Sequence, residues 1–259
     1  MAKDRVDERG RRANVVKDRR NAGQRNFYIA LGAIALVGVA ALAYKMNAGG
    51  RAAEISTVGV VAKPAEAKPY TIGKPDAPVT VIEFADFECP GCGQYATLTE
   101  PDVRQRLVDG GVIQYHYYDY PLTQHLNSLF ASNAASCADD QGKFWPMHDA
   151  LFNGQPNWNG EASRDPKAIF RGYAKDIGLD VSKWEQCYDS HPHLARILSN
   201  RAYGESLKVN QTPTFIIGKR QMPGALTYDR FKLYVDSALA DAGVKPAAAD
   251  SARKKSTGP

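Results

Sequence analysis

Residues 79–92 read VTVIEFADFECPGC, and this stretch joins a predicted buried strand to a predicted helix. The run from Val79 to Phe84 is mostly apolar and β-branched, as expected of a central strand. Cys89 and Cys92 follow it with the spacing Cys-x-x-Cys. At a helix start, free backbone N–H groups and the positive end of the macrodipole stabilise a thiolate. The stretch therefore predicts a thiol–disulfide redox site at a strand-to-helix junction.

The alternative for this pair is half of a zinc site. A structural zinc site needs a second close pair of Cys or His ligands. The other two cysteines, Cys137 and Cys187, are far apart in the sequence from each other and from the first pair. The pattern therefore favours redox chemistry, with the disulfide itself as the redox group and with no bound metal or separate cofactor.

The first 26 residues form a basic tail. They contain nine Lys or Arg and four Asp or Glu, which gives a net charge of +5. The whole chain of 259 residues has 33 basic and 28 acidic residues and also carries +5, so residues 27–259 are neutral overall. The basic charge therefore belongs to the tail, and no nucleic-acid partner is expected.

An apolar run follows the tail, from Phe27 to Tyr44, without a charged residue. Its length is close to the minimum for a membrane-spanning helix, and tyrosines near both ends suit the interfacial aromatic belts. We expect one transmembrane helix over residues 27–45 in contact with membrane lipid, the tail 1–26 in the cytoplasm, and the rest exported. A cleaved signal peptide is the alternative, since Ala41-Leu42-Ala43 resembles a cleavage site. Both interpretations place the Cys-x-x-Cys pair where disulfides persist.

Composition divides the exported part into a linker, one folded unit and a tail. Residues 46–69 are rich in Ala, Gly, Lys and Pro without a periodic pattern and predict a flexible linker. Residues 245–259 consist mainly of Ala, Lys, Ser and Pro and predict a disordered end. The unit between them, 70–244, is long enough for a single hydrophobic core.

The folded unit alternates between strand and helix patterns and then changes to helix alone. Residues 90–108 predict a helix that Pro101 kinks or restarts, and residues 112–118 predict a second strand. Helical spacing then dominates about residues 124–208. Strands at 212–218 and 219–222 and a helix from 228 to about 240 complete the unit. This order predicts an α/β fold with an all-helical block inserted between its two halves.

The helical block contains apolar residues at intervals of three and four, which we expect to form its core. Asp180 has the position of a helix N-cap. His125 and His148 are expected to be structural or solvated rather than catalytic. The predicted core residues are Leu126, Phe130, Ala134, Cys137, Phe144, Met147, Leu151, Ile169, Tyr173, Ile177, Val181, Trp184, Tyr188, Leu194, Ile197 and Leu198.

Several segments together resemble one family. Residues 83–92 resemble the active-site segment of the thioredoxin superfamily, and the helical insertion with Thr212-Pro213 resembles its DsbA branch of exported disulfide oxidoreductases. The run Ala134 to Ala138, followed by Gln141 to Trp145, is similar to the insertion of membrane-anchored DsbA-like proteins. The resemblance covers about residues 70–243. It implies a thioredoxin-like fold with an inserted all-helical domain, preceded here by the transmembrane helix.

The resemblance implies a catalytic role for three residues. Cys89 is expected to be the nucleophile, as the more exposed sulfur at the helix start, and Cys92 to resolve the mixed disulfide. Glu83 occupies the position of a buried acid beneath the disulfide, where it relays a proton to or from Cys92. An acid at an ordinary strand end is the alternative for Glu83.

Substrate binding is expected beside the disulfide, at Pro90, Gly91, Thr212 and Pro213. Pro213 is expected to be a cis-proline that faces the disulfide, and the backbone of Thr212 then pairs with an extended substrate segment. A trans proline that starts a strand is the alternative. The best-known family member has histidine where this chain has Gly91. Glycine has no side chain to stabilise a thiolate, so the extreme oxidising power of that member is not expected here.

Cys137 and Cys187 are expected to form a second, structural disulfide. The predicted compartment is oxidising, and both cysteines fall on the apolar side of predicted helices in the same block. DsbA-like relatives with paired cysteines in this block support the pairing. Two free buried cysteines that act as small hydrophobes are the alternative.

These expectations define an anchored enzyme with its catalytic domain on the periplasmic or extracellular side. It would donate the Cys89–Cys92 disulfide to reduced or misoxidised exported proteins, and an integral-membrane thiol oxidase would restore it. A reductase or isomerase of the same compartment is the alternative, because direction depends on the reduction potential. A client-binding protein without redox turnover, or a zinc-binding module, belongs to a different class.

Overall fold

The structure, a computed structural model, describes Gly38, residues 56–57 and residues 63–244. The predicted tail 1–26, the predicted end 245–259 and, apart from Gly38, the predicted transmembrane helix 27–45 lie outside these residues. Among the residues that the structure describes, none of the helices has both the length and the apolar character that a membrane span requires.

Strand β3 (Val79–Ala85) lies in the middle of the sheet and leads into the Cys-x-x-Cys pair. It runs parallel to β4 (Ile113–Asp119) and antiparallel to β5 (Thr214–Ile217). Val81 and Phe84 point to opposite faces of the sheet, and both are fully buried. Burial of both faces explains why the strand reads as a nearly continuous apolar run.

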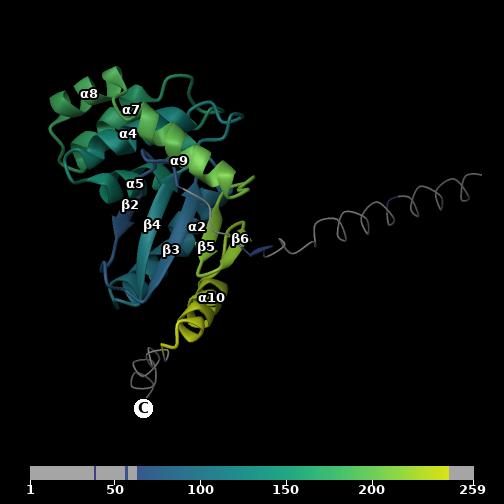
Figure 1. Ribbon diagram of the computed structural model, residues 1–259. Coiled ribbons are helices and arrows are strands. Elements are labelled where there is room, and N and C mark those ends of the chain that lie inside the picture. Colours follow the sequence, from purple (N-terminus) through teal and green to yellow (C-terminus); the bar gives the residue numbers. More distant parts are fainter. Residues whose placement is uncertain (1–37, 39–55, 58–62, 245–259) are drawn as a thin grey trace, which may run out of the picture. The chain divides into compact units, whose positions relative to one another are not determined.

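Among the described residues, the sheet has six strands in the order β1-β6-β5-β3-β4-β2. Figure 1 labels the neighbours from β2 through β4, β3 and β5 to β6. Strand β6 (Arg220–Pro223) pairs antiparallel with β5, and the short strands β1 (Ser56–Thr57) and β2 (Tyr70–Ile72) form the edges. The sequence did not predict the edge strands, because two or three residues are too few to show an alternating pattern.

The segment predicted as a flexible linker, 46–69, differs from that expectation in the part that the structure describes. Strand β1 lies within it and pairs with β6. Ala67 is fully buried, and the backbone N–H of Lys68 donates a hydrogen bond to Asn200 Oδ1 at 2.9 Å. The folded unit therefore extends to the N-terminal side of residue 70.

One face of the sheet is covered by helices from both halves of the fold. Helix α2 (Pro90–Leu98) ends at Thr99, and α3 (Glu100–Val103) restarts with Pro101 in its first turn, followed by a π-helical turn, η1 (Arg104–Val108). Helix α10 (Tyr228–Asp241) completes the layer. The core beneath these helices includes Val81, Tyr115, Phe215, Phe231 and Val235.

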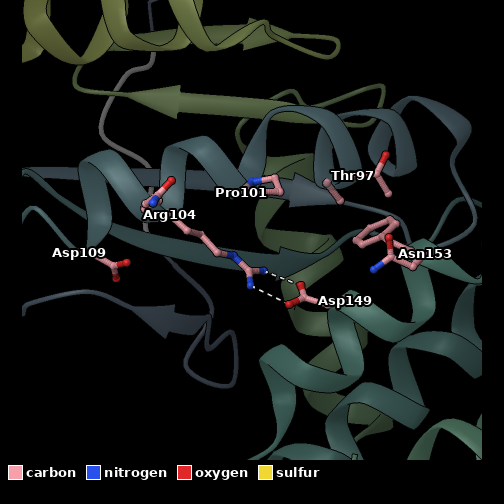
Figure 2. A pocket seen from close by; sticks show the side chains of 9 residues that line it. Thr97, Pro101, Arg104, Asp109, Asp149 and Asn153 are labelled. Carbon is pink, nitrogen blue, oxygen red and sulfur yellow. Dashed lines mark hydrogen bonds and ion pairs between the residues drawn. The ribbon is translucent and has the colours of Figure 1, made fainter. Parts of the chain in front are cut away.

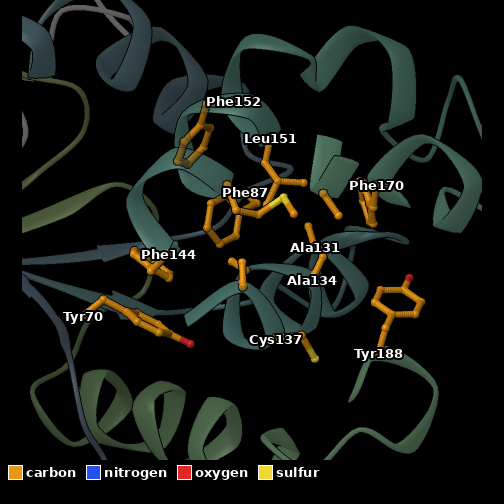
Figure 3. Packing of buried hydrophobic residues seen from close by; sticks show 14 of the residues in the cluster. Tyr70, Phe87, Ala131, Ala134, Cys137, Phe144, Leu151, Phe152, Phe170 and Tyr188 are labelled. Carbon is orange, nitrogen blue, oxygen red and sulfur yellow. The ribbon is translucent and has the colours of Figure 1, made fainter. Parts of the chain in front are cut away.

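Six helices form the block inserted between β4 and β5. They are α4 (Ser128–Asp139), α5 (Phe144–Asn153), α6 (Gln155–Trp158), α7 (Lys167–Asp176), α8 (Val181–Ser190) and α9 (Leu194–Ser206). Figure 3 shows Phe87 among the core residues of the block, with Phe144, Leu151 and Phe152 around it. Because Phe87 belongs to the loop between β3 and Cys89, the helical core fixes the position of that loop.

Part of the predicted helical core is wrong. Leu126 and Phe130 are 45% and 40% exposed, and Leu194 and Leu198 are also exposed. Helix α4 instead buries a face of small residues, mainly Ala and Ser, which allows neighbouring helices to approach closely.

Helix α7 also turns a different face inward from the predicted one. Phe170 and Ala174 are fully buried, whereas Ile169 and Tyr173 are only partly buried. Tertiary packing decides which of two adjacent apolar faces turns inward.

Candidate active site

Cys89 is the N-cap residue of α2, with extended backbone angles and Pro90 in the first turn. Its carbonyl accepts the first helical hydrogen bond, from the N–H of Gly93 at 3.0 Å. Both thiols are free, and Cys89 is 8% exposed whereas Cys92 is fully buried. A proline at the first helical position removes one N–H that would have no partner and sets the helical backbone angle. The sequence therefore places the sulfur of Cys89 at the positive end of the helix.

The environment of Cys89 stabilises its thiolate. A hydrogen bond from the Cys92 thiol is the main cause that lowers the pKa of Cys89 to about 6, with burial acting in the opposite direction. The side chain of Thr212 and the backbone N–H groups of Gly91 and Cys92 also favour the anion. Hydrogen bonds to the charged form lower a thiol pKa, so Cys89 is largely ionised at neutral pH.

Cys92 has the opposite environment. Burial, followed by its hydrogen bond to Cys89 and the charge of that thiolate, raises the pKa of Cys92 well above its ordinary value. The backbone N–H of Asp86 points at Cys92 Sγ at 3.5 Å. The two sulfurs therefore differ, because Cys89 favours the thiolate whereas Cys92 keeps its proton.

Glu83 lies on β3, the strand that leads into the pair, and is only 2% exposed. Burial, then the negative charge of Glu100, raises the pKa of Glu83 well above its ordinary value. The hydroxyl of Tyr115 donates a hydrogen bond to Glu83 Oε2 at 2.8 Å. The charge of Glu83 in turn raises the pKa of Cys92, so the structure brings the acid within electrostatic range of the buried sulfur.

The predicted substrate-binding residues gather around Cys89. The peptide bond between Thr212 and Pro213 is cis. The Cys89 thiol donates a hydrogen bond to the carbonyl oxygen of Thr212 at 3.3 Å. A Cβ added to Gly91 would lie 3.4 Å from Pro213 Cδ, in ordinary contact. Pro90 is exposed beside them.

Asp86 links the loop before Cys89 to the loop after β4. Its fully buried carboxylate accepts hydrogen bonds from the backbone N–H groups of Glu88 and Leu122, both at 2.8 Å. It also contacts His125 Nδ1 at 2.7 Å. This hydrogen bond raises the pKa of His125, and the charges of Asp86 and Cys89 act in the same direction. The sequence predicts a structural or solvated role for His125, and the structure places it within electrostatic range of Cys89.

Glu88 makes a second connection to the inserted block. Its carboxylate accepts hydrogen bonds from the backbone N–H groups of Asn127 and Gly160. Gln155 adds a third connection, since its Nε2 donates to the carbonyl oxygens of Phe87 at 2.6 Å and Cys89 at 3.0 Å. The sequence analysis did not identify Asp86, Glu88 or Gln155. Two acids within three residues of a Cys-x-x-Cys motif were the signal available for the first two.

Cys137 and Cys187 form a disulfide that joins α4 to α8, with an S–S distance of 2.02 Å and a Cα–Cα distance of 5.7 Å. Among the described residues, the only potential metal cluster consists of these two cysteines and His193. Two sulfurs joined to each other offer no thiolate to a metal ion, and Cys89 and Cys92 are not part of this cluster.

Comparisons with known proteins agree with this geometry. A family model described as Thioredoxin matches residues 65–237. Because it covers more than half of the chain, the protein belongs to this thioredoxin family. The expected DsbA-like fold is confirmed by the crystal structure of Wolbachia pipientis alpha-DsbA1, which superposes with a TM-score of 0.61 at 22% identity and covers 70% of this chain and 94% of that chain.

Two curated relatives are similar in sequence. The Na(+)/H(+) antiporter NhaA 3 of Salinispora tropica is 35% identical over 175 residues, which are 67% of this chain and 25% of the antiporter. The chain thus spans about a quarter of the length of that relative. The probable disulfide bond formation protein D of Bacillus anthracis is 25% identical over 171 residues, which are 65% of this chain and 77% of that protein.

Proposed function

We propose that this protein is a thiol–disulfide oxidoreductase that donates the Cys89–Cys92 disulfide to reduced or misoxidised exported proteins. The observation that carries the proposal is the contrast between the two sulfurs. The pKa of Cys89, about 6, reflects a stabilised thiolate in the reduced enzyme. The thiol of Cys92 stays protonated because its pKa is raised. Stabilisation of the reduced form makes a disulfide a better oxidant, which favours donation over reduction.

The reaction has two thiol–disulfide exchange steps. A substrate thiolate attacks Cys89 Sγ, the Cys89–Cys92 bond breaks, and Cys92 leaves and takes up a proton. A second substrate thiolate then attacks the substrate sulfur of the mixed disulfide, and Cys89 leaves as a thiolate. The substrate loses two electrons, the enzyme gains them, and the only groups that change are thiols and disulfides, so no further cofactor is required.

The residues around the sulfurs have separate roles in these steps. Thr212 and Pro213 border Cys89, and we assign them to backbone recognition of an extended substrate segment, together with Pro90 and Gly91. We assign Glu83 to proton exchange with Cys92. Glu83 hydrogen bonds to Tyr115 rather than to a sulfur among the described residues, so a bridging water would complete the transfer.

The compartment and the redox partner follow from the same proposal. We place the catalytic domain on the extracytoplasmic side of the cell membrane, anchored through residues 27–45. An integral-membrane thiol oxidase would accept the electrons and restore the disulfide. Protease added to cells with a permeable outer layer should digest the chain after Lys45 and spare the tail. Recovery of a soluble protein that begins near Tyr44 would instead support a cleaved signal peptide.

A trapping experiment tests the activity. The oxidised protein should convert a reduced dithiol peptide to its disulfide in one-to-one stoichiometry. Cys92→Ala that has first been converted by oxidised glutathione to the mixed disulfide at Cys89 should exchange glutathione for a single-thiol peptide and accumulate the Cys89–peptide disulfide. Cys89→Ala, treated in the same way as the matched control, should accumulate none. Rapid insulin reduction without peptide oxidation would favour the reductase. Peptide oxidation at the wild-type rate in both variants would exclude this pair as the redox site. Absence of both peptide oxidation and insulin reduction in the wild-type protein would favour a client-binding function.

A further inference from the structure

The disulfide between Cys137 and Cys187 lies among side chains that bind metal ions. The ligand atoms of Cys137, Cys187 and His193 all lie within 4.8 Å of one another. Asp140 adds a fourth group, since its Oδ2 lies 2.9 Å from His193 Nε2 and 3.4 Å from Cys187 Sγ. Two sulfurs, an imidazole nitrogen and a carboxylate oxygen are ligands that zinc takes in proteins. We call these four residues the disulfide cluster.

Along the sequence the four residues form two short pairs. Cys137 and Asp140 are separated by two residues at the C-terminal end of α4, where Asp140 is the C-cap. Cys187 and His193 are separated by five residues, across the turn from α8 to α9, where His193 is the N-cap. Structural zinc sites commonly combine two ligand pairs with about two to five residues within each pair. The spacing in the sequence therefore agrees with the arrangement in the fold.

Contacts other than the disulfide hold α4 and α8 together. The side chain of Gln141, just after α4, donates to the carbonyl oxygen of Asp180 at 3.2 Å and accepts from its N–H at 2.9 Å. Trp184 on α8 is fully buried, and its Nε1 donates to the carbonyl oxygen of Ala134 on α4 at 3.0 Å. We therefore expect the two helices to stay adjacent when the bond between the sulfurs is broken.

The spacing of the ligand atoms is close to that of a tetrahedral zinc site. Zinc lies about 2.3 Å from a sulfur and about 2.0–2.2 Å from a nitrogen or a carboxylate oxygen, so its ligand atoms are roughly 3.4–3.8 Å apart. The distances from Asp140 Oδ2 to Cys187 and His193, 3.4 and 2.9 Å, are within about 0.5 Å of this range. The side chains of Asp140 and His193 are 49% and 21% exposed, so an ion can enter from solvent.

Asp140 differs in charge balance from the acids at the pocket of about 360 Å³ between α2 and α5 (Figure 2). At that pocket Arg104 pairs with Asp149 at 3.0 Å and with Glu100 at 2.6 Å, so the guanidinium balances both carboxylates. Among the described residues, Asp140 pairs instead with His193, which is charged only when protonated. Reduction of the disulfide adds two thiols that ionise when they bind a metal. A divalent cation would balance this negative charge.

We propose that the helical block in its reduced form binds a single zinc ion through Cys137, Cys187, His193 and Asp140. The ion replaces the disulfide as the cross-link between α4 and α8, and it also fixes the start of α9. Thiolate and imidazole ligands select zinc over Mg²⁺ and Ca²⁺, which prefer oxygen. This inference goes beyond the proposed function, because none of the four residues acts at Cys89.

The change from disulfide to zinc site is a redox step followed by metal binding. A dithiol reductant transfers two electrons and two protons to the bond between Cys137 and Cys187. The dithiol becomes a disulfide, and the two cysteines become thiols. Zinc then displaces both thiol protons and binds the neutral form of His193, so its affinity falls as the pH is lowered. Oxidation of the two thiolates to the disulfide releases the ion.

Cobalt binding tests the site, because tetrahedral Co²⁺ with thiolate ligands absorbs visible and near-ultraviolet light whereas Zn²⁺ does not. The full chain should carry Cys89→Ala and Cys92→Ala, so that Cys137 and Cys187 supply the only thiols. After reduction by a water-soluble phosphine, which adds no thiol, we expect one Co²⁺ per chain and a sulfur-to-cobalt charge-transfer band. One equivalent of Zn²⁺ should remove the band. The same chain with its disulfide intact is the control and should show no band.

Two variants of this parent chain test the ligands other than cysteine. His193→Asn and Asp140→Asn should each weaken Co²⁺ binding by about tenfold or more, since even the loss of a group that only supports a ligand has an effect of this size. The matched controls are His191→Asn and Asp139→Asn, which change the same residue types beside the cluster and should bind Co²⁺ like the parent. Asparagine tolerates the left-handed backbone of His191, where φ is 50°.

Urea unfolding shows whether the ion binds the folded chain. Zinc should raise the urea midpoint of the reduced parent chain and leave that of the oxidised chain unchanged. If the reduced chain unfolds without metal, addition of zinc should fold it, because the binding free energy then contributes to folding.

Two results would overturn the zinc site. The first is a reduced parent chain that gives no charge-transfer band with Co²⁺. The second is equal Co²⁺ affinity in the parent and in His193→Asn or Asp140→Asn, which would show that the thiols bind the ion without the rest of the cluster. Both differ from a failure of the proposed function, which would appear as a wild-type protein without a redox-active Cys89/Cys92 couple.

Discussion

The Cys89 thiol and the carbonyl oxygen of Thr212 are 3.3 Å apart, although 123 residues separate them in the sequence. This contact joins the start of α2 to the segment before β5, which are the two halves of the fold that the helical block interrupts. The Thr212 hydroxyl is buried and has no hydrogen-bond partner while Cys89 is a thiol, among the residues described. It is therefore free to donate to the sulfur once the thiolate forms, which lowers the pKa of Cys89.

Removal of the Thr212 hydroxyl should destabilise the Cys89 thiolate. Thr212→Val keeps the shape of the side chain and loses the donor, so the pKa of Cys89 should rise by about one unit, since a hydrogen bond to a charged group contributes about 1.5 kcal/mol or more. Thiolate absorbance as a function of pH measures the change, and Thr80→Val on the exposed side of β3 is the control. An unchanged pKa in Thr212→Val would mean that the Cys92 thiol and the backbone N–H groups stabilise the thiolate without the Thr212 hydroxyl.

Burial of Glu83 should lower the free energy of unfolding of the protein at neutral pH. An acid whose pKa is higher in the folded state favours folding most below its ordinary pKa, and this contribution is lost as the pH rises toward the folded value. Glu83→Gln should therefore be more stable than wild type at neutral pH by about 1 kcal/mol or more, and the gain should shrink near pH 4 to 5. Urea unfolding at both pH values measures this. A variant less stable than wild type at neutral pH would show that Glu83 is paired as an anion.

His125 should show the opposite dependence. Its pKa is raised by the hydrogen bond to buried Asp86, so its contribution to stability is fully present below the ordinary histidine value and disappears as the pH rises through the folded value. We expect His125→Gln to be less stable than wild type in mild acid and to approach it in mild alkali. His191→Gln is the control. His193→Gln is less suitable because His193 contacts Asp140. Equal losses at every pH would indicate a packing role instead.

The disulfide of the helical block should stabilise the fold without taking part in turnover. Closure of the loop between Cys137 and Cys187, 50 residues apart, contributes about 4 kcal/mol in the chain-entropy model. The double variant Cys137→Ala/Cys187→Ala should lose up to this amount in urea unfolding and still oxidise peptide at low temperature. Peptide mapping of the unreduced protein checks the pairing itself. Two alkylatable thiols at these positions would contradict it.

The central strand and the position of the redox pair could be predicted from sequence because their signals are local. An apolar β-branched run, a Cys-x-x-Cys pair and Pro90 in the first turn each act through neighbouring residues. The restart of the helix at Pro101 and the N-cap at Asp180, whose side chain accepts a hydrogen bond from the N–H of Lys183, have the same local origin.

Other parts of the fold and site depend on contacts between distant segments. Asp86 meets His125 and Glu88 meets Gly160 only after the helical block has packed against the Cys89 loop. Glu100 is one of several acids in an amphipathic segment, and only the fold shows that it is buried. The inward face of α4 was predicted wrongly for the same reason, because close packing selected small side chains over Phe130.

The reduction potential of the Cys89/Cys92 couple tests the account most directly. It can be measured by equilibration with glutathione buffers followed by alkylation and mass spectrometry. A stabilised Cys89 thiolate, without a histidine at Gly91, predicts a value between about −200 and −120 mV, on the oxidising side of the range for thioredoxin-like proteins. A value near −270 mV, as in a thioredoxin that reduces its substrates, would contradict disulfide donation and identify the protein as a reductase.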